Sequence, residues 1–245
     1  MKNAVIIQAR MGSTRLSGKV MKVLCDKTVL AHDIERVKIA KNVDEIIIAT
    51  TNSRNDDIIE REALKYGAKV FRGSEEDVLS RYYYAAKENN IDVIIRITSD
   101  CPLLDPNILE DMIEIFYSHS YDYMSNQAPV LEERTYPRGL DTEIFTFNKL
   151  EEAHNNARKH YQREHVTPYI YENTENKYHC KSEINYSKYR WTLDTFEDWN
   201  LISKVYEYLY KGRHDFFLKE IVTLMEEHPE LEKINNMIEQ KPTVS

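Results

Sequence analysis

Short apolar stretches alternate with amphipathic ones through the first part of the chain. The apolar stretches are rich in β-branched residues and are bounded by polar or glycine positions, which is typical of buried parallel strands. Between them, apolar residues recur at i, i+3 and i+4 opposite charged faces, which is typical of helices. The predicted strands are Ala4–Ala9, Glu45–Thr51, Lys69–Arg72 and Asp92–Thr98, and the predicted helices are Val29–Lys41, Asp56–Tyr66 and Glu76–Asn89. This alternation predicts an α/β fold with a doubly wound, mostly parallel sheet.

Beyond this region the pattern continues with a helix over Ile108–His119 and then changes. Residues 121–147 alternate short extended pieces with turn residues, which predicts a small antiparallel insertion. Further helices are predicted over Lys149–Lys159, Arg163–Tyr171, Glu197–Tyr210 and Phe217–Glu227, followed by a polar, peripheral tail after Pro229. No linker divides the sequence, so we expect a single domain over residues 1–245 that carries this insertion.

The overall composition excludes several classes of protein. The 245 residues are 42% hydrophobic and 30% charged, and the net charge of −8 predicts no nucleic acid partner and no attraction to an anionic membrane. No apolar run approaches the length of a membrane span. The widely spaced Cys25, Cys101 and Cys180 favour a reduced, cytoplasmic setting. Cys101 could be a nucleophile, but no base is indicated for it, and a buried thiol usually acts as a small hydrophobe.

The segment that follows the first strand, residues 8–20, concentrates groups that bind phosphate. Gly12 and Gly18 allow close backbone approach, while Arg10, Arg15 and Lys19 supply positive charge. It is not a Walker A loop, because five residues separate the glycines and valine follows the lysine. A solvated basic turn is the alternative. The position directly after a buried strand favours an anion-binding loop, because ligands lie beyond the carboxyl ends of parallel strands.

Two aspartates are candidate ligands for a magnesium ion. Asp100 follows the fourth strand, and Asp194 ends an apolar extended piece just before a helix. Mg²⁺ prefers one or two carboxylates together with phosphate oxygens and water. The alternative role for such an aspartate is a helix cap, which is the interpretation that we prefer for Asp105 before Pro106. Asp100 and Asp194 can share an ion only if the fold brings them together.

The loop reads Gln8-Ala9-Arg10-Met11-Gly12-Ser13-Thr14-Arg15-Leu16-Ser17-Gly18-Lys19. This segment resembles the N-terminal signature of the acylneuraminate and 3-deoxy-manno-octulosonate cytidylyltransferases, in particular of their spore coat polysaccharide biosynthesis protein F branch. Ser17 replaces the usual proline, and Phe196 replaces the proline of an Asp-Thr-Pro-Glu-Asp motif beginning at Asp194. The resemblance implies a Rossmann-like, GT-A-like nucleotidyltransferase fold. It also implies an enzyme that transfers CMP from CTP to an acidic or surface-polysaccharide sugar and releases pyrophosphate.

The resemblance and the charge pattern assign roles to individual residues. Asp100 and Asp194 are expected to bind Mg²⁺, with Lys19 and Arg15 completing the catalytic group. The attacking hydroxyl would lose its proton to a metal-bound hydroxide or to one of the two aspartates. The implied nucleotide-binding residues are Gln8, Ala9, Arg10, Met11, Gly12, Ser13, Lys19, Arg72 and Arg81. The implied sugar-binding residues are Arg138, Asp141, Glu143, Arg163 and His165.

Several alternatives stay open at this point. Arg72 is our first choice for reading the pyrimidine, and Arg81 could instead form a surface ion pair with Asp77. The resemblance implies a homodimer in which the insertion at residues 121–147 crosses to the partner. A glycosyltransferase with a nucleotide-sugar donor is a second hypothesis, although Ser99-Asp100-Cys101 offers one carboxylate where such enzymes have two. A catalytically silent nucleotide-binding module is a third.

Overall fold

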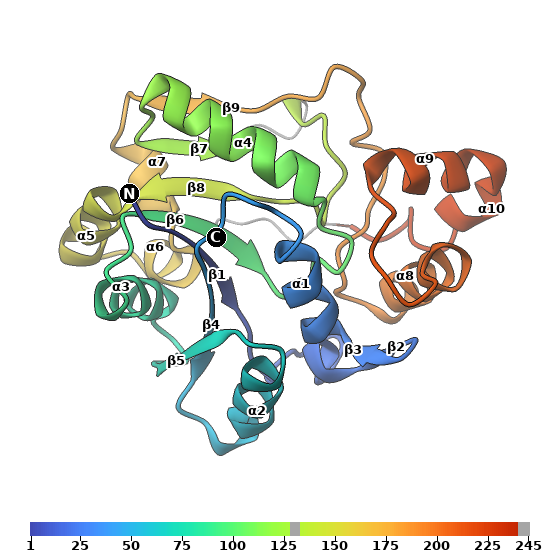
Figure 1. Ribbon diagram of the computed structural model, residues 1–245, viewed down its shortest axis with the longest axis horizontal. Coiled ribbons are helices and arrows are strands. Elements are labelled where there is room, and N and C mark those ends of the chain that lie inside the picture. The colour runs from blue at the N-terminus through green and yellow to red at the C-terminus, as the bar shows by residue number, and fades with distance from the viewer. Residues whose placement is uncertain (128–132, 240–245) are drawn as a thin grey trace.

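A seven-stranded sheet forms the centre of the computed structural model, which describes residues 1–127 and 133–239 (Figure 1). The strand order is β5-β4-β1-β6-β8-β7-β9. Its parallel half consists of β1 (Asn3–Gln8), β4 (Glu45–Thr51), β5 (Lys69–Gly73) and β6 (Val93–Thr98). These are the four strands that the apolar stretches predict, with bounds shifted by one residue at most.

The other half of the sheet is mixed. Strand β8 (Glu143–Thr146) runs antiparallel to β6 and to β7 (Tyr123–Ser125), while β7 pairs in parallel with β9 (Lys177–His179). The antiparallel character predicted for residues 121–147 is therefore confirmed, although residues 128–132 of that insertion lie outside the described residues. The sequence pattern does not predict β9 or the hairpin β2–β3 (Val23–Leu24 and Lys27–Thr28), because strands of two or three residues show no period.

All the predicted helices are present, but one of them is divided. The helix predicted over Arg163–Tyr171 is wrong as a single element, because Val166 adopts φ 71° and Pro168 has no amide proton, so two short helices form instead. The helices are α1 Val29–Val37, α2 Asp57–Lys65, α3 Val78–Glu88, α4 Pro106–His119, α5 Phe147–Asn156, α6 His160–His165, α7 Pro168–Glu172, α8 Phe196–Leu209, α9 Leu218–Glu227 and α10 Pro229–Glu232. The 3₁₀ turns η1 Lys19–Met21 and η2 Arg54–Asp56 precede α1 and α2.

The two faces of the sheet bury separate cores. Val5 and Ile7 of β1 pack with apolar residues of α1, α4, α8 and α9, whereas Ala4 and Ile6 pack with α3, α5 and α7. This division follows from the period of two along a strand. Because both faces carry helices (Figure 1), the sheet is doubly wound, as the sequence predicts.

The strand order places a ligand crevice at the carboxyl ends of β1 and β6. The chain moves from β1 outward to β4 and β5, and then returns to the other side of β1 as β6. Loops diverge at such a topological switch point, which leaves room for a ligand. The loops after Gln8 and Thr98, which hold the phosphate-binding signature and Asp100, both begin there.

The tail that was expected to be peripheral is in part integrated. Leu231 of α10 is buried in the core, and Asn235 is also buried and donates hydrogen bonds to the Arg190 carbonyl and to Asp198. The expectation is therefore wrong up to this residue. Polar composition suggested solvent exposure, but an amide satisfies polar groups that an apolar residue would leave unpaired. Within residues 1–127 and 133–239, no helix is long and apolar enough to cross a membrane.

Candidate active site

The loop that follows β1 is held open by hydrogen bonds at its base. The Met11 amide donates to Asp56 at 2.8 Å, and the Met11 carbonyl accepts from the amides of Ser13 and Gly18. Gly18 has φ 61°, which favours glycine. No described residue accepts a hydrogen bond from the amides of Arg10 or Gly12. The loop therefore presents free donors beside basic side chains, as phosphate binding requires.

Lys19 links the two predicted metal ligands. Its Nζ lies 2.8 Å from Asp100 Oδ2 and 2.9 Å from Asp194 Oδ1, although 94 residues separate the aspartates in the sequence. Arg15 contacts the other Asp194 oxygen at 3.0 Å. The structure thus brings together all four residues predicted to be catalytic, on the crevice side of the sheet. The opposite arrangement, with the cations and the acids on different faces, is excluded.

Backbone contacts explain how the aspartates converge. The Leu193 amide donates to the Asp100 carbonyl at 2.8 Å, so the extended piece before α8 runs directly beside the end of β6. Asp194 is not the cap of α8, because Thr195 occupies that position and forms a capping box with Asp198. Asp105, in contrast, caps α4 by accepting from the Asn107 amide, which confirms the structural interpretation made for it.

Burial and charge shift the pKa values in this group. Burial by itself would lower the pKa of the Lys19 ammonium, but the charges of Asp100 and Asp194 and their hydrogen bonds raise it above its ordinary value. Burial would raise the pKa of Asp100, yet the adjacent Lys19 charge lowers it below its usual range. The lysine therefore stays protonated and Asp100 stays ionised at neutral pH.

A second layer of buried polar residues fixes Asp194, and it was not identified from the sequence. Arg190 pairs with Asp198 at 2.9 Å and with Asp194 at 3.3 Å, while Asp198 also accepts from the Asp194 and Thr195 amides at 3.0 Å. Asn235 donates to Asp198 as well. The spacing from Thr195 to Asp198, which is typical of a capping box, was the one available signal in the sequence.

Comparisons with known proteins can now be set beside this geometry. Residues 4–241 match the family described as cytidylyltransferase. The chain is 35% identical over 235 residues to the spore coat polysaccharide biosynthesis protein SpsF of Bacillus subtilis, with 92% of this chain and 94% of that protein covered. A solved cytidylyltransferase from Leptospira borgpetersenii is 38% identical, with a TM-score of 0.89 over 98% of this chain and 100% of the other.

The chain belongs to the cytidylyltransferase family. It is therefore a nucleotidyltransferase, as the loop and the aspartates predict. A solved CMP:2-keto-3-deoxy-manno-octonic acid synthetase complexed with CTP, at 17% identity and a TM-score of 0.62 over 84% of this chain and 99% of that one, shares the fold.

The two arginines predicted to read the base have different surroundings in this cytidylyltransferase. Arg72 donates to the Thr51 and Ser53 carbonyls and pairs with Asp57 and Glu60 at 2.7 Å, so its guanidinium is fully engaged at the start of α2. Arg81 is buried instead.

The buried Arg81 is the better placed of the two. A Cβ on Gly73 would lie 2.9 Å from Arg81 Cγ, which puts this side chain at the carboxyl end of β5. Its Nε and one terminal nitrogen, Nη1, have no hydrogen-bond partner among the described residues. The surface ion pair with Asp77 is wrong, because Asp77 pairs with Arg163. Burial lowers the Arg81 pKa below its ordinary value.

The predicted acceptor residues are spread over two environments. Arg163 binds Asp77 and the His154 carbonyl, and Asp141 pairs with Arg134, so both already have partners within the protein. Glu143 is buried and binds Arg96, Tyr123 and Thr167, so it too already has partners within the protein. These contacts place Glu143 in a structural network.

Arg138 and His165 remain available to an acceptor. Arg138 pairs through its backbone with Arg190, and Gly139 allows this approach because a Cβ there would lie 2.4 Å from the Trp191 backbone. No acid among the described residues forms an ion pair with Arg138. Burial lowers the pKa of Arg138, and so does the neighbouring charge of Arg134.

A strained turn presents His165. Val166, a β-branched residue, has φ 71° and ψ −57°, and the Thr167 amide donates to the His165 carbonyl at 2.8 Å. Thr167 is tied in turn to Glu143 at 2.7 Å. Burial lowers the His165 pKa, which keeps the imidazole neutral at neutral pH.

Gln8 and Ala9, which were predicted to bind nucleotide, are held by the neighbouring strands. Gln8 accepts from Arg96 at 3.0 Å, and the Ala9 amide donates to the Ala49 carbonyl at 3.3 Å. Arg96, which the sequence did not indicate, therefore joins the nucleotide loop to Glu143.

Cys101 is buried beside Asp100. Its burial and, to a smaller extent, the Asp100 charge raise the pKa of the thiol well above its ordinary value. A thiol that stays protonated suits packing and not nucleophilic attack.

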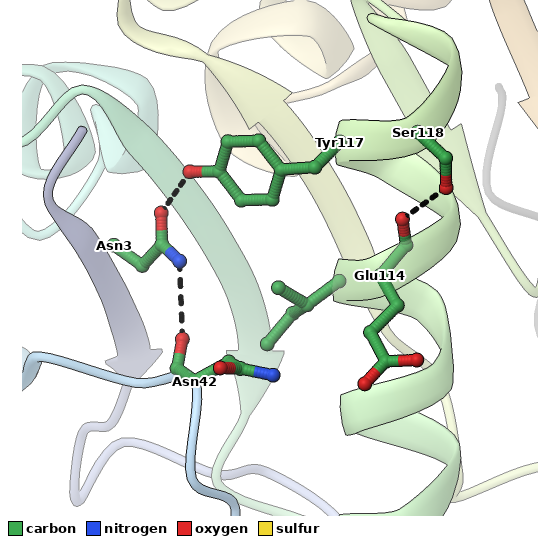
Figure 2. Close-up of a pocket in the computed structure, with 6 residues that line it drawn as sticks. Asn3, Asn42, Glu114, Tyr117 and Ser118 are labelled. Carbon is green, nitrogen blue, oxygen red and sulfur yellow. Dashed lines mark hydrogen bonds between the residues drawn. The ribbon is translucent and has the colours of Figure 1, made fainter.

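Two other features lie outside this site. A surface cavity of about 460 Å³ lies at the amino end of β1, where Figure 2 shows Asn3 bonded to Tyr117 and to Asn42. It contains no predicted site residue and lies at the end of β1 away from the crevice.

The second feature is a polar cluster between α1 and the loop after α8. His32 Nδ1 lies 3.3 Å from His214 Nε2, which is 3.2 Å from Glu35. Lys27 pairs with Glu35 at 2.8 Å, and Arg36 lies 3.4 Å from the other His214 nitrogen. Burial, with the Arg36 charge, lowers the His214 pKa to about 3. With two cations already present, this cluster is a hydrogen-bonded packing contact.

Proposed function

We propose that this enzyme transfers CMP from CTP to a sugar destined for a surface polysaccharide, with release of pyrophosphate. The observation that carries the proposal is the contact of Lys19 with both Asp100 and Asp194 at the switch point of the sheet. The surface-polysaccharide acceptor is proposed from the likeness to the spore coat protein. We also propose a cytoplasmic location, which the three free cysteines favour. A homodimer remains part of the proposal, because the family resemblance implies it.

The aspartates fit a magnesium ion. Both are hard oxygen donors, both face the same point, and the free amides of the loop lie on the same edge of the sheet. When bound there by Asp100 and Asp194, Mg²⁺ would supply charge neutralisation to the phosphates of the nucleotide and polarise the α-phosphate.

The chain's own residues neutralise and orient the triphosphate. A nucleoside triphosphate carries about four negative charges, which repel an incoming oxygen nucleophile. Lys19 and Arg15 offset this charge, and the free Arg10 and Gly12 amides donate to phosphate oxygens. The unpaired Arg81 donates to the pyrimidine, since a buried guanidinium with free N–H groups is a strong donor to a carbonyl oxygen.

The acceptor is held by Arg138 and His165, whose side chains form no hydrogen bond or ion pair with another described residue. Arg138 binds an anionic group of the sugar, and the neutral His165 exchanges a hydrogen bond with a hydroxyl. In-line placement of the attacking hydroxyl supplies most of the remaining rate enhancement. Its proton passes to Asp100, to Asp194 or to a hydroxide, and the three routes remain alternatives.

The test is pyrophosphate release from each of CTP, UTP, ATP and GTP with a panel of nonulosonic, octulosonic and amino sugars. We expect release with CTP and with one class of sugar. Turnover of a nucleotide sugar without pyrophosphate would establish the glycosyltransferase alternative. Stabilisation of the fold by CTP in a thermal-shift screen, with no turnover for any sugar, would favour a silent binding module.

A further inference from the structure

The carboxylates that are proposed to bind magnesium have no free oxygen in this structure. Asp100 Oδ1 accepts from Thr98 at 2.5 Å and Oδ2 accepts from Lys19 at 2.8 Å. Asp194 Oδ1 accepts from Lys19 at 2.9 Å, and Oδ2 contacts Arg15 at 3.0 Å and Arg190 at 3.3 Å. Each of the four carboxylate oxygens therefore already accepts from, or pairs with, a donor of the protein itself, and Lys19 is the partner of both Asp100 Oδ2 and Asp194 Oδ1.

The charges of this group are balanced without any ligand. In the part of the chain that the structure describes, three cations, Lys19, Arg15 and Arg190, face three acids, Asp100, Asp194 and Asp198. A divalent cation added alone would leave a large excess of positive charge in a partly buried place. A divalent cation added together with a triphosphate would not, because the triphosphate brings about four negative charges.

Among the described residues, Lys19 is the one cation that pairs with both Asp100 and Asp194. Its ammonium lies between Asp100 Oδ2 and Asp194 Oδ1, whereas Arg15 and Arg190 both pair with Asp194 through its Oδ2 atom. If Lys19 moves away, one oxygen on each aspartate becomes free, while Thr98 and Arg190 still hold the two side chains in place. The lysine ammonium sits on a flexible stem of four carbons, so it can move to another position by side-chain rotation while the backbone stays in place.

We infer that Lys19 occupies the cation position in the nucleotide-free protein and that triphosphate must draw it away before the two aspartates bind a divalent ion. This inference rests on the proposed function. Binding of the divalent ion would then depend on bound nucleotide, and the ion would bind weakly on its own. The lysine that competes with the ion would also bind the phosphates of the nucleotide.

The first measurement is Mn²⁺ binding to the full, nucleotide-free chain, followed by the electron paramagnetic resonance signal of free Mn²⁺. Lys19→Met should bind Mn²⁺ about tenfold more tightly than the wild type, because the competing ammonium is gone. Lys22→Met is the matched control, since it removes the same charge only three residues from Lys19. The Lys22 ammonium lies over the ring of Trp199 and not between the aspartates. Lys22→Met should stay within about twofold of the wild type. Asp194→Asn added to Lys19→Met should abolish the gain.

The second measurement is CTP binding by calorimetry in the presence of EDTA. Lys19→Met should bind metal-free CTP about tenfold more weakly than the wild type, while Lys22→Met should not. Opposite effects of one substitution on the two ligands are the specific expectation. Lys19→Gln provides a second variant if the methionine protein does not fold, as judged by circular dichroism.

Equal Mn²⁺ affinity in Lys19→Met and Lys22→Met would overturn the inference. So would a gain that survives Asp194→Asn, since the ion would then bind elsewhere. Failure of the proposed function has a different signature, which is no CTP binding and no pyrophosphate release by the wild type. The Mn²⁺ result does not depend on either of those observations.

Discussion

The two acids beside the end of β6, Asp100 and Asp194, and the acid that begins β8, Glu143, are used in different ways. Asp100 and Asp194 are partly exposed, with side-chain exposures of 21% and 14%, and they contact cations that a ligand can replace. Glu143 is 4% exposed and is shared among an arginine, a tyrosine and a threonine, each from a different element. Both sets look alike in the sequence, as acids that follow or begin a strand.

The difference shows that burial and the number of partners distinguish an acid that can bind a ligand from an acid that only stabilises the fold. A carboxylate with exchangeable partners at a crevice can bind a ligand, whereas one with saturated buried partners cannot leave them without leaving a charge unpaired. We call the crevice side of the sheet that holds Asp100 and Asp194 the nucleotide edge. Under the proposed function this edge carries the chemistry, whereas the network around Glu143 fixes Thr167 and so the turn that follows His165.

The largest expected effect breaks the nucleotide edge. Asp100→Asn should lower the rate of pyrophosphate release about 1000-fold, because it removes a charge that faces the reacting phosphates. The variant should still fold, as judged by circular dichroism, since the amide keeps the shape, although loss of the pairing with Lys19 lowers its free energy of unfolding. Asp105→Asn, five residues away, is the control, because Asp105 accepts from the backbone amides of Asn107 and Leu218 and contacts neither Lys19 nor Asp194 among the described residues. Equal rates in the two variants would remove Asp100 from the mechanism.

The next prediction concerns the other region. Glu143→Ala should lower the free energy of unfolding by about 3 kcal/mol, because it leaves the Arg96 guanidinium buried without its acid. Urea denaturation measures this directly. Asp141→Ala is the comparison, since the Asp141 side chain is more exposed at 20% and its loss should destabilise the fold less. If Glu143→Ala stayed as stable as the wild type and lost only acceptor affinity, Glu143 would be a direct sugar ligand.

Most of the fold was predictable because local pattern determines it, and the pairing of Asp100 with Asp194 was expected from the family resemblance. The four apolar strands follow from β-branched runs, and the loop after Gln8 follows from its glycines and cations. What the sequence could not provide depends on distant partners. Asn235 looks like tail and Arg190 looks like an ordinary strand cation, but they meet at Asp198 only through the packing of α8 and α10.

The same reason explains why the sequence could not rank the candidate ligands. Arg72 and Arg81 flank the same glycine-containing segment, and spacing cannot show that one is saturated and the other unpaired. The break at Val166 depends on a positive φ that tertiary contacts impose on a β-branched residue, against its local preference. Sequence identifies which side chains can act, whereas partners and burial decide which of them do.

Substitutions of Arg81 and Arg72 should have smaller effects than those of Asp100 and Glu143. Arg81→Lys should weaken CTP binding about tenfold, because lysine lacks the planar fork of donors. Arg72→Lys should leave CTP affinity near that of the wild type and lower the thermal midpoint instead, since Arg72 joins β5 to the start of α2. Calorimetric titration and thermal unfolding of both proteins distinguish the two roles. A greater loss of affinity in Arg72→Lys would restore the first choice made from the sequence.

The smallest effect concerns Asp33 of α1, which lies on the nucleotide side but is buried like Glu143. Neither of its carboxylate oxygens has a partner among the described residues, and burial, followed by the Asp100 charge, raises its pKa well above the ordinary value of 3.8. The folded state therefore keeps a proton that the unfolded chain releases, so this group stabilises the fold below about pH 3.8 and loses that contribution as the pH rises towards the folded pKa.

Asp33→Asn abolishes this titration. The variant should match the wild type near pH 4 and become more stable by about 1 kcal/mol at neutral pH, with the gap widening between those values. Thermal unfolding at a series of pH values measures the gap. A difference in stability that stays constant across the series would mean that Asp33 is ionised in the folded protein. The nucleotide edge would then contain a third ionised acid beside Asp100 and Asp194, and its contrast with the network around Glu143 would be larger.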